Sequence, residues 1–143
     1  MKTIGRHLIA EFYRCDSTVL NDVESIRQTM LEAAQRIGAT VMGDTFHRFT
    51  PQGVSGTVVI SESHLSVHTW PEYRYVAVDI YTCGGLDPRP GFGQIRRDLS
   101  AEGWRVQEIL RGLPADLDGN TMPLPDDIKI ITRLVPEREL TAV

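Results

Sequence analysis

The sequence contains few of the features that would place a protein in a specialised class. Only two of its 143 residues are cysteines, Cys15 and Cys83, which make a poor disulfide framework. We therefore expect free thiols and a cytoplasmic protein, with a single bridge between the two as the alternative. No apolar run approaches a membrane span, and the first residues lack the apolar core of a secretory signal. The formal net charge of −4 gives no reason to expect a nucleic acid or an anionic membrane as partner.

What is present is the composition of an ordinary globular domain. Hydrophobic residues make up 41% of the chain and charged residues 24%. A chain of this length can bury roughly 70% of its extended surface, so it needs neither disulfides nor a metal to form a core. No internal repeat and no second domain is visible, and we predict a single domain over residues 1–143.

Hydrophobic periodicity predicts two amphipathic helices. The first is capped by Asn21, has apolar residues at spacings of three and four, and ends at Gly38. The second opens at residues 87–90 and is closed by Gly103. The apolar faces consist of Val23, Ile26, Met30, Ala34 and Ile37 in the first helix, and of Phe92, Ile95 and Leu99 in the second.

Segments rich in β-branched and aromatic residues predict the strands of a sheet. They are Arg6–Arg14, Ala39–Phe49, Val54–Ile60, Leu65–Trp70, Tyr73–Thr82 and Trp104–Leu110. Their close spacing favours hairpins and an antiparallel sheet, with both helices packed on one face. We therefore predict an α+β fold, a two-layer sandwich. Beyond it, the prolines of Leu113–Asp127 indicate an extended arm, and Ile128–Val135 is compatible with a short added strand.

The stretch Val58–Glu72, V-V-I-S-E-S-H-L-S-V-H-T-W-P-E, puts serines, a glutamate and two histidines in the middle of this apolar sheet. A turn at Ser-Glu-Ser would explain the serines, and lone histidines in sheets are more often structural than catalytic. Side chains alternate between the two faces of a strand, however. One face therefore carries His64, Ser66, His68 and Trp70. A turn does not explain a face that is polar and aromatic at its centre.

Metal binding and serine hydrolysis are weak interpretations of this stretch. His64 and His68 would lie about 13 Å apart on a strand, too far to share one ion, so we predict no metal site. The segment Gly53–Thr57 resembles the G-x-S-x-G motif of hydrolases but lacks the second glycine at the right place. It also lies between a turn and a strand, whereas that motif needs a strand, a turn and a helix in order.

Self-cleavage of the backbone fits these residues better. A serine hydroxyl can attack the peptide bond before it, given a proton carrier and donors for the intermediate. The chain would become an ester, and elimination would leave a carbonyl at the new N-terminus. Ser63 follows Glu62 and has His68 and Ser55 close in sequence, so the required groups are present.

Three blocks of the sequence resemble the short prokaryotic S-adenosylmethionine decarboxylase proenzymes, a family of pyruvoyl enzymes. They are G-R-H-L-I-A-E-F-Y-R-C-D, F-H-R-F-T-P-Q-G-V-S-G-T-V-V-I-S-E-S-H-L-S-V-H-T-W-P-E-Y and V-D-I-Y-T-C-G. The resemblance covers Met1 to about Gly112 and leaves residues 113–143 as a divergent tail.

The resemblance implies autocatalytic cleavage of a zymogen between Glu62 and Ser63. The products would be a β-chain of residues 1–62 and an α-chain of residues 63–143 that begins with a pyruvoyl group made from Ser63. Ser55 and His68 match the positions that assist this processing, His68 as proton carrier. Cys83 matches the proton donor to the decarboxylated carbon, a role that suits a partly enclosed thiol. A buried structural cysteine is the plainer interpretation of Cys83.

The resemblance also implies the substrate and the assembly. S-adenosylmethionine would form a Schiff base with the pyruvoyl group and lose carbon dioxide, giving the propylamine donor for spermidine, a polyamine. Phe49 and Trp70 are the candidates for stacking on adenosine, and Glu72 for binding its ribose; ordinary core packing is an equal interpretation of Trp70. Family members of this size form homodimers with sites near the interface, so we expect a homodimer.

Two alternatives stay open at this point. Similar pyruvoyl enzymes decarboxylate arginine or ornithine, and Arg74, where a small residue is expected, or the tail could reshape the substrate site. The chain could also be an unprocessed homologue that binds a nucleoside without catalysis.

Overall fold

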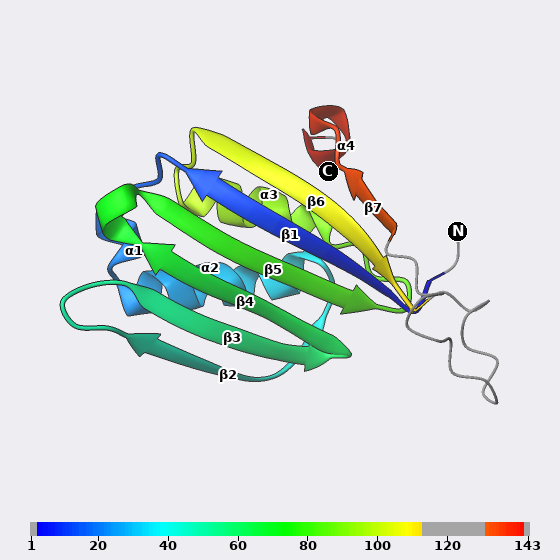
Figure 1. Ribbon diagram of the computed structural model, residues 1–143. Coiled ribbons are helices and arrows are strands. Elements are labelled where there is room, and N and C mark those ends of the chain that lie inside the picture. The colour runs from blue at the N-terminus through cyan, green and yellow to red at the C-terminus, as the bar shows by residue number, and fades with distance from the viewer. Residues whose placement is uncertain (1–2, 113–130, 142–143) are drawn as a thin grey trace, which may run out of the picture.

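The computed structural model describes residues 3–112 and 131–141 and contains one antiparallel sheet with helices on one face (Figure 1). The strands are β1 (Gly5–Tyr13), β2 (Thr40–Arg48), β3 (Val54–Ser61), β4 (Ser63–Trp70), β5 (Tyr75–Cys83), β6 (Gly103–Arg111) and β7 (Ile131–Leu134), in the spatial order β2-β3-β4-β5-β1-β6-β7. The helices are α1 (Ser17–Leu20), α2 (Val23–Arg36), α3 (Arg89–Asp98) and α4 (Glu137–Thr141), with a 3₁₀ turn at Pro71–Tyr73. Every neighbouring pair of strands is antiparallel, which confirms the predicted α+β sandwich.

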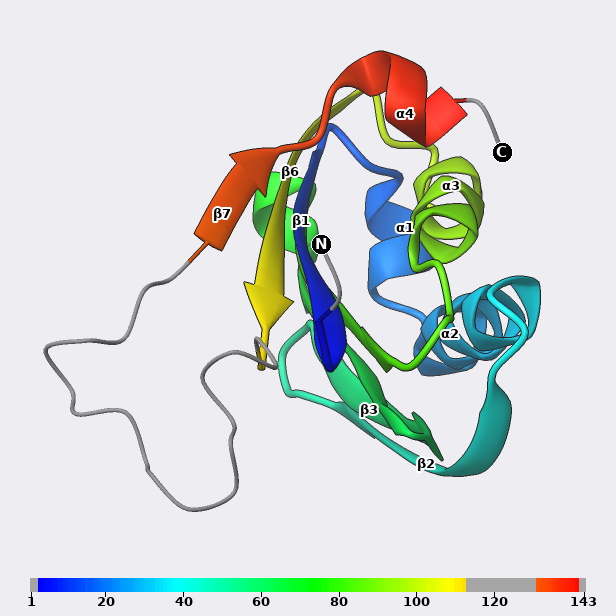
Figure 2. The same cartoon turned by 90° about the vertical axis from the view of Figure 1, so that its right-hand side faces the viewer.

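Strict alternation along the central strands separates a core face from an open face. Leu8, Ala10 and Phe12 of β1 are buried on the side of the sheet where Figure 2 shows α2 and α3. The intervening residues of β1 are only partly buried. The sheet is therefore filled with apolar side chains on one side, whereas none of the described helices covers the other. We call the uncovered side the outer face.

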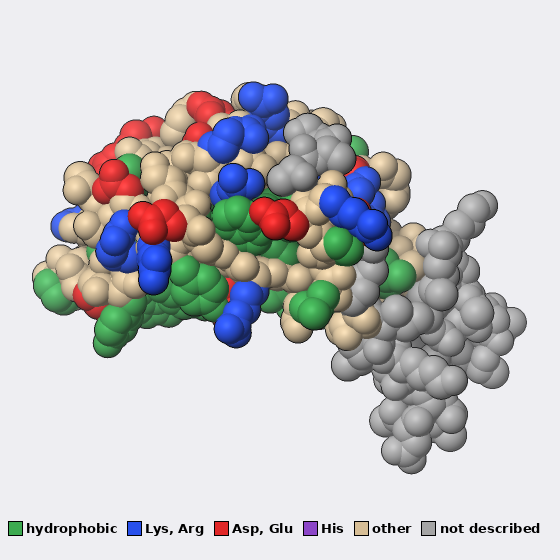
Figure 3. Space-filling view, turned by 90° about the horizontal axis from the view of Figure 1, so that it is seen from above, with side chains coloured by type: hydrophobic (Ala, Val, Ile, Leu, Met, Phe, Trp, Pro, Cys, Tyr) green, Lys and Arg blue, Asp and Glu red, His purple; other side chains and the backbone are tan. Residues whose placement is uncertain are grey.

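The charged side chains do not gather into a patch of one sign on the side shown in Figure 3. Arg side chains alternate there with Asp and Glu, and hydrophobic side chains lie between them. This mixture agrees with the small net charge of the chain.

The helix ends differ from the sequence prediction. Asp22, not Asn21, caps α2, because its carboxylate accepts hydrogen bonds from the backbone N–H and the hydroxyl of Ser25. Asn21 instead ends α1, and its side-chain oxygen accepts from the N–H of Gly53 at 3.1 Å. The predicted C-terminal end at Gly38 is confirmed, since Gly38 has φ 75° directly after the helix.

The second helix also ends earlier than predicted. α3 stops at Asp98, with Leu99 as its C-cap and Ser100 at φ 53°, and Gly103 opens β6 instead of closing the helix. The predicted added strand is confirmed where the structure describes it, because Ile131–Leu134 pairs with β6. Residues 113–127, predicted as an extended arm, lie outside the described residues.

Candidate active site

The outer face carries the polar residues of the unusual stretch, as the alternation of β4 predicts. Leu65, Val67 and Thr69 are buried toward the helices, whereas His68 and Trp70 are exposed on the opposite side. The neighbouring strand β5 alternates in the same way, with its apolar residues buried and the others partly exposed. The outer-face residues of β5 are Tyr75, Ala77, Asp79, Tyr81 and Cys83.

Ser63 occupies the tight corner between β3 and β4. Its φ is 121°, in a region that residues with a side chain rarely adopt. An outlier of this kind costs of order 1–3 kcal/mol and persists only where the surrounding structure holds it. Here pairing with Thr82 of β5 and with Ile60 of β3 holds it. The backbone is therefore strained at the bond next to the Glu62–Ser63 peptide.

Cys83 lies close to this corner, because its neighbour Thr82 is the cross-strand partner of Ser63. It is a free thiol of intermediate burial, which agrees with a side chain facing a reaction site better than with a buried structural cysteine. Tyr81 lies on the same face, and its ring contacts His64 and His7 at centroid distances of 5.7 and 5.3 Å. We call Ser63, His64, Tyr81, Cys83 and His7 the hairpin-end cluster.

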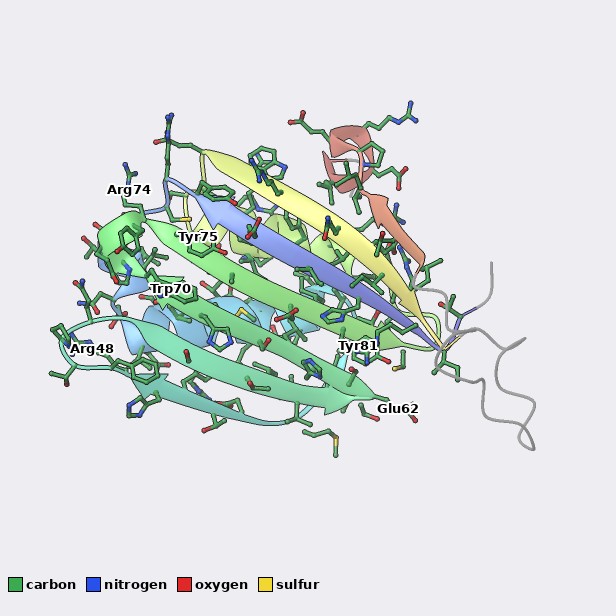
Figure 4. All side chains as sticks on the ribbon, viewed as in Figure 1. Arg48, Glu62, Trp70, Arg74, Tyr75 and Tyr81 are labelled. Carbon is green, nitrogen blue, oxygen red and sulfur yellow. The ribbon has the colours of Figure 1, made fainter. Side chains whose placement is uncertain are left out.

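The other predicted site residues gather at the opposite end of the outer face. Ser55 Oγ and His68 Nδ1 form a hydrogen bond of 2.7 Å across the β3–β4 pair. Trp70 is 38% exposed and stacks on Tyr75 with the ring centroids 5.3 Å apart, so core packing does not account for it. Figure 4 shows these two side chains together, far from Tyr81 and Glu62.

Phe49 and Glu72 lie at the same end of the sheet, Glu72 in the 3₁₀ turn beside α1. Phe49 is 47% exposed, with its ring against that of His47, and Glu72 accepts a hydrogen bond from Gln52 at 3.2 Å. We call Phe49, Ser55, His68, Trp70 and Glu72 the far-end cluster.

A single chain does not bring the two clusters together. On β4, His68 lies five residues and Trp70 seven residues beyond Ser63. At about 3.3 Å per residue these separations are roughly 16 and 23 Å, too far for His68 to exchange a proton at the Glu62–Ser63 bond. The predicted residues thus form two half-sites on one face.

Sequence reasoning missed a polar chain in the middle of this face. Asp79 accepts hydrogen bonds from His7 Nε2 at 2.9 Å and from Ser66 Oγ at 3.0 Å. The hydrogen bond from His7 is the main cause of the lowered pKa of Asp79, and burial lowers the pKa of His64. The alternation D-I-Y-T-C of Asp79–Cys83 was the available signal, because it places Asp79, Tyr81 and Cys83 on one face.

Replacing Asp79 with asparagine should lower the melting temperature at neutral pH by removing the charged partner of His7. A carboxylate whose folded pKa is depressed stabilises the fold above its unfolded pKa and loses that effect as pH falls through the folded value. The difference between wild type and Asp79→Asn should therefore shrink below the ordinary Asp value of 3.8. Calorimetry across pH 3–7 measures it, and a difference independent of pH would contradict this account.

Arg74 is occupied away from the outer face. Its guanidinium donates to the carbonyl oxygens of Cys15 at 2.8 Å and Arg14 at 3.1 Å, so it ties the turn before β5 to the end of β1. Figure 4 shows it beyond the end of the sheet. The idea that Arg74 reshapes a substrate site therefore has no support in its contacts.

The described ranges contain neither a cluster of metal-binding side chains nor a helix that could span a membrane. Within residues 3–112 and 131–141, no three His, Cys, Asp or Glu side chains are grouped so that they could hold a metal ion. In the same part of the chain, no helix is both long and apolar enough to cross a membrane.

Comparison with known proteins identifies the family. The protein-family model described as S-adenosylmethionine decarboxylase matches residues 6–112 of this chain. Proteins named S-adenosylmethionine decarboxylase proenzyme from Thermosipho melanesiensis and Thermotoga maritima are 54% and 55% identical over 113 residues, which is 78% of this chain and 87% of each relative. The crystal structure of the adenosylmethionine decarboxylase from Aquifex aeolicus aligns with a TM-score of 0.74 and 30% identity, covering 86% of this chain and all 100% of that one. The chain belongs to the S-adenosylmethionine decarboxylase family.

Proposed function

We propose that this protein cleaves itself between Glu62 and Ser63, converts Ser63 into a pyruvoyl group and decarboxylates S-adenosylmethionine. The observation that carries the proposal is the strained corner at Ser63, with φ 121°, beside the strand that ends in the free thiol of Cys83. The names of the relatives support the choice of substrate over arginine or ornithine.

The surroundings of Ser63 fit a residue that becomes a pyruvoyl group. The hydroxyl attacks the carbonyl carbon of Glu62, the peptide bond opens to an ester, and elimination releases the carboxylate of Glu62. Water then hydrolyses the imine that results at Cα, which forms the carbonyl and releases the nitrogen of Ser63 as ammonia, so the torsion that is held at 121° ceases to exist. Cleavage therefore releases strain of order 1–3 kcal/mol that the uncut chain carries.

The residues of the chain then bind the substrate and move its protons. The pyruvoyl carbonyl supplies an electrophile for the substrate amine and accepts the electron pair left when carbon dioxide departs. Cys83 would return a proton to that carbon, and the pairing of its strand with Ser63 supports this role. His68 of a second copy of the chain would carry the proton during cleavage, with Ser55 of that copy holding its ring through the 2.7 Å hydrogen bond.

A second copy of the chain is needed to complete this site, because the far-end cluster lies roughly 16–23 Å from Ser63 on the same strand. A two-fold axis that lies between two stacked sheets, parallel to them and perpendicular to their strands, relates the opposite ends of the two sheets. Two outer faces packed in this way would put the far-end cluster of one protomer over the hairpin-end cluster of its partner. The homodimer would thus hold two equivalent sites between its sheets.

The far-end cluster has the chemistry that adenosine requires. Phe49 and Trp70 expose flat aromatic surface on which a purine can stack, and they contribute it from neighbouring parts of the open face. Glu72 offers carboxylate oxygens, which accept hydrogen bonds from the two ribose hydroxyls. The substrate would therefore span the interface, with its amino acid end at Ser63 and its nucleoside on the partner.

Carbon dioxide release by the purified protein, offered S-adenosylmethionine, arginine and ornithine separately, tests the proposal. We expect release from S-adenosylmethionine alone and two bands on a denaturing gel. Release from arginine or ornithine would refute the substrate assignment. A chain that stays full length after long incubation would refute the pyruvoyl mechanism, leaving an unprocessed homologue.

A further inference from the structure

A glycine creates an open notch beside Cys83 on the outer face. Gly5 of β1 pairs with Cys83 on one side and with Arg111 of β6 on the other, so the three residues form a row across the sheet. Residues that pair directly across antiparallel strands have their side chains side by side. Because Gly5 has no side chain, the middle position of this row is empty.

The phenol of Tyr81 fills this notch. A Cβ atom built on Gly5 would lie 2.4 Å from Cε2 of Tyr81 and 2.7 Å from its hydroxyl oxygen. These separations are shorter than any van der Waals contact, so any larger residue at this position would displace the ring. The hydroxyl therefore lies in the place of a side chain directly beside Cys83, and a side-chain hydrogen bond with Cys83 is one cause of the raised pKa of Tyr81.

Three neighbours hold the ring of Tyr81 in this position. The guanidinium of Arg111 lies over the ring, 4.4 Å from its centroid, and the rings of His7 and His64 contact it at 5.3 and 5.7 Å. A cation over an aromatic face is attractive and limits the tilt of the ring. The hydroxyl is thus presented to Cys83 by a fixed side chain.

Tyr81 is in the donor form at neutral pH. Burial raises the pKa of Tyr81, and a negative charge on Cys83 raises it further, while Arg111 acts in the opposite direction. The phenol therefore keeps its proton at neutral pH and is able to donate a hydrogen bond.

We propose that Tyr81 is a positioning residue for Cys83, whose hydroxyl, placed in the Gly5 notch, holds the thiol and stabilises the thiolate. The role in turnover rests on the proposed decarboxylase function, but the contact itself does not. In turnover the S–H bond of Cys83 breaks and a C–H bond forms at the carbon that has lost carbon dioxide. The sulfur keeps the electron pair, accepts the hydrogen bond from Tyr81, and later regains a proton from water.

The test measures the alkylation of Cys83 by iodoacetamide in the full-length protein as isolated, across a range of pH. The thiolate is the reacting form, so loss of a donor should slow the reaction at a given pH. Since one such hydrogen bond changes an equilibrium by about threefold to tenfold, Tyr81→Phe should react about that much more slowly at mildly alkaline pH. Peptide mass spectrometry separates Cys83 from Cys15, which is fully buried.

Two further variants sharpen this measurement. Gly5→Ala leaves the phenol intact but displaces it, so it should slow alkylation as Tyr81→Phe does. Tyr75→Phe removes a hydroxyl from the same strand that bonds to Glu11, and it should leave the alkylation of Cys83 unchanged. Circular dichroism melts show which variants are folded; if Gly5→Ala does not fold, the comparison of Tyr81→Phe with Tyr75→Phe is sufficient.

The outcomes separate this proposal from the proposed function, because alkylation requires neither cleavage nor substrate. An unchanged profile in folded Tyr81→Phe would overturn the role of Tyr81 even if the protein decarboxylates S-adenosylmethionine. Slower alkylation in a protein that releases no carbon dioxide would support the contact and refute the function. In an active protein, Tyr81→Phe should also lower kcat with little change in KM, since it acts on proton delivery and not on binding.

Discussion

Ser63→Ala is expected to remain one uncut chain of 16.0 kDa and to release no carbon dioxide from S-adenosylmethionine. In the proposed mechanism the hydroxyl of Ser63 attacks the Glu62 carbonyl, and its later elimination with the Glu62 carboxylate turns the rest of Ser63 into the pyruvoyl group. Its removal therefore eliminates cleavage and catalysis together, a loss far larger than any change of binding. Intact mass and a denaturing gel follow the cleavage, and trapped carbon dioxide follows the reaction.

Ser61→Ala is the matched control for this variant. Ser61 lies on the other side of Glu62, is exposed, and ends β3. It should be cut as fast as wild type if the strained residue itself supplies the nucleophile. A Ser63→Ala chain that is still cleaved would show that another group attacks the peptide bond. A Ser61→Ala chain that remains uncut would indicate that Ser61, and not Ser63, is the nucleophile.

A mixture of two inactive variants is expected to regain about a quarter of wild-type activity. Cys83→Ala damages the hairpin-end cluster and Trp70→Ala the far-end cluster. If each site takes one cluster from each protomer, a heterodimer has one site with both defects and one site with none. Random reassortment makes about half of the dimers heterodimers, so about one site in four is intact. Co-refolding of the two variants, followed by carbon dioxide release, measures this recovery.

Variants within one cluster provide the control for reassortment. Trp70→Ala mixed with Glu72→Gln should regain no activity, because every site in the heterodimer then carries one defect. A tag of different mass on one variant shows that heterodimers have formed. If heterodimers form and Cys83→Ala with Trp70→Ala regains nothing, the two half-sites do not meet across a dimer interface.

The local pattern of the chain was enough to predict the sheet and the helices on one face. Period-two alternation in Leu65–Trp70 and the spacing of Val23, Ile26 and Met30 depend only on neighbouring residues, and both predictions were confirmed. The cap of α2 was placed one residue early, because Asn21 and Asp22 are both good capping residues. Only the fold decides between these two candidates, because the side-chain oxygen of Asn21 accepts a hydrogen bond from the backbone N–H of Gly53 and is not available to cap α2.

The position of Ser63 in a tight, polar corner was also predictable, but the relation between the site residues was not. Residues such as Ser63 and His68 are close in sequence, which suggested that they act together. An extended strand separates them instead, because each intervening residue adds about 3.3 Å to the distance between Ser63 and His68. The contacts of Arg74 with the end of β1 were likewise invisible, because they join residues about sixty positions apart.

By itself, the sequence determined what depends on adjacent residues: which face of each strand is polar, and the blocks that identify the family. The tertiary structure alone decided which strands pair, and therefore that Gly5 lies between Cys83 and Arg111 and opens a notch for Tyr81. Pairing partners are selected by the packing of a core whose members are distant in the chain. For this reason the two half-sites and the Tyr81–Cys83 contact became visible only once the sheet was assembled.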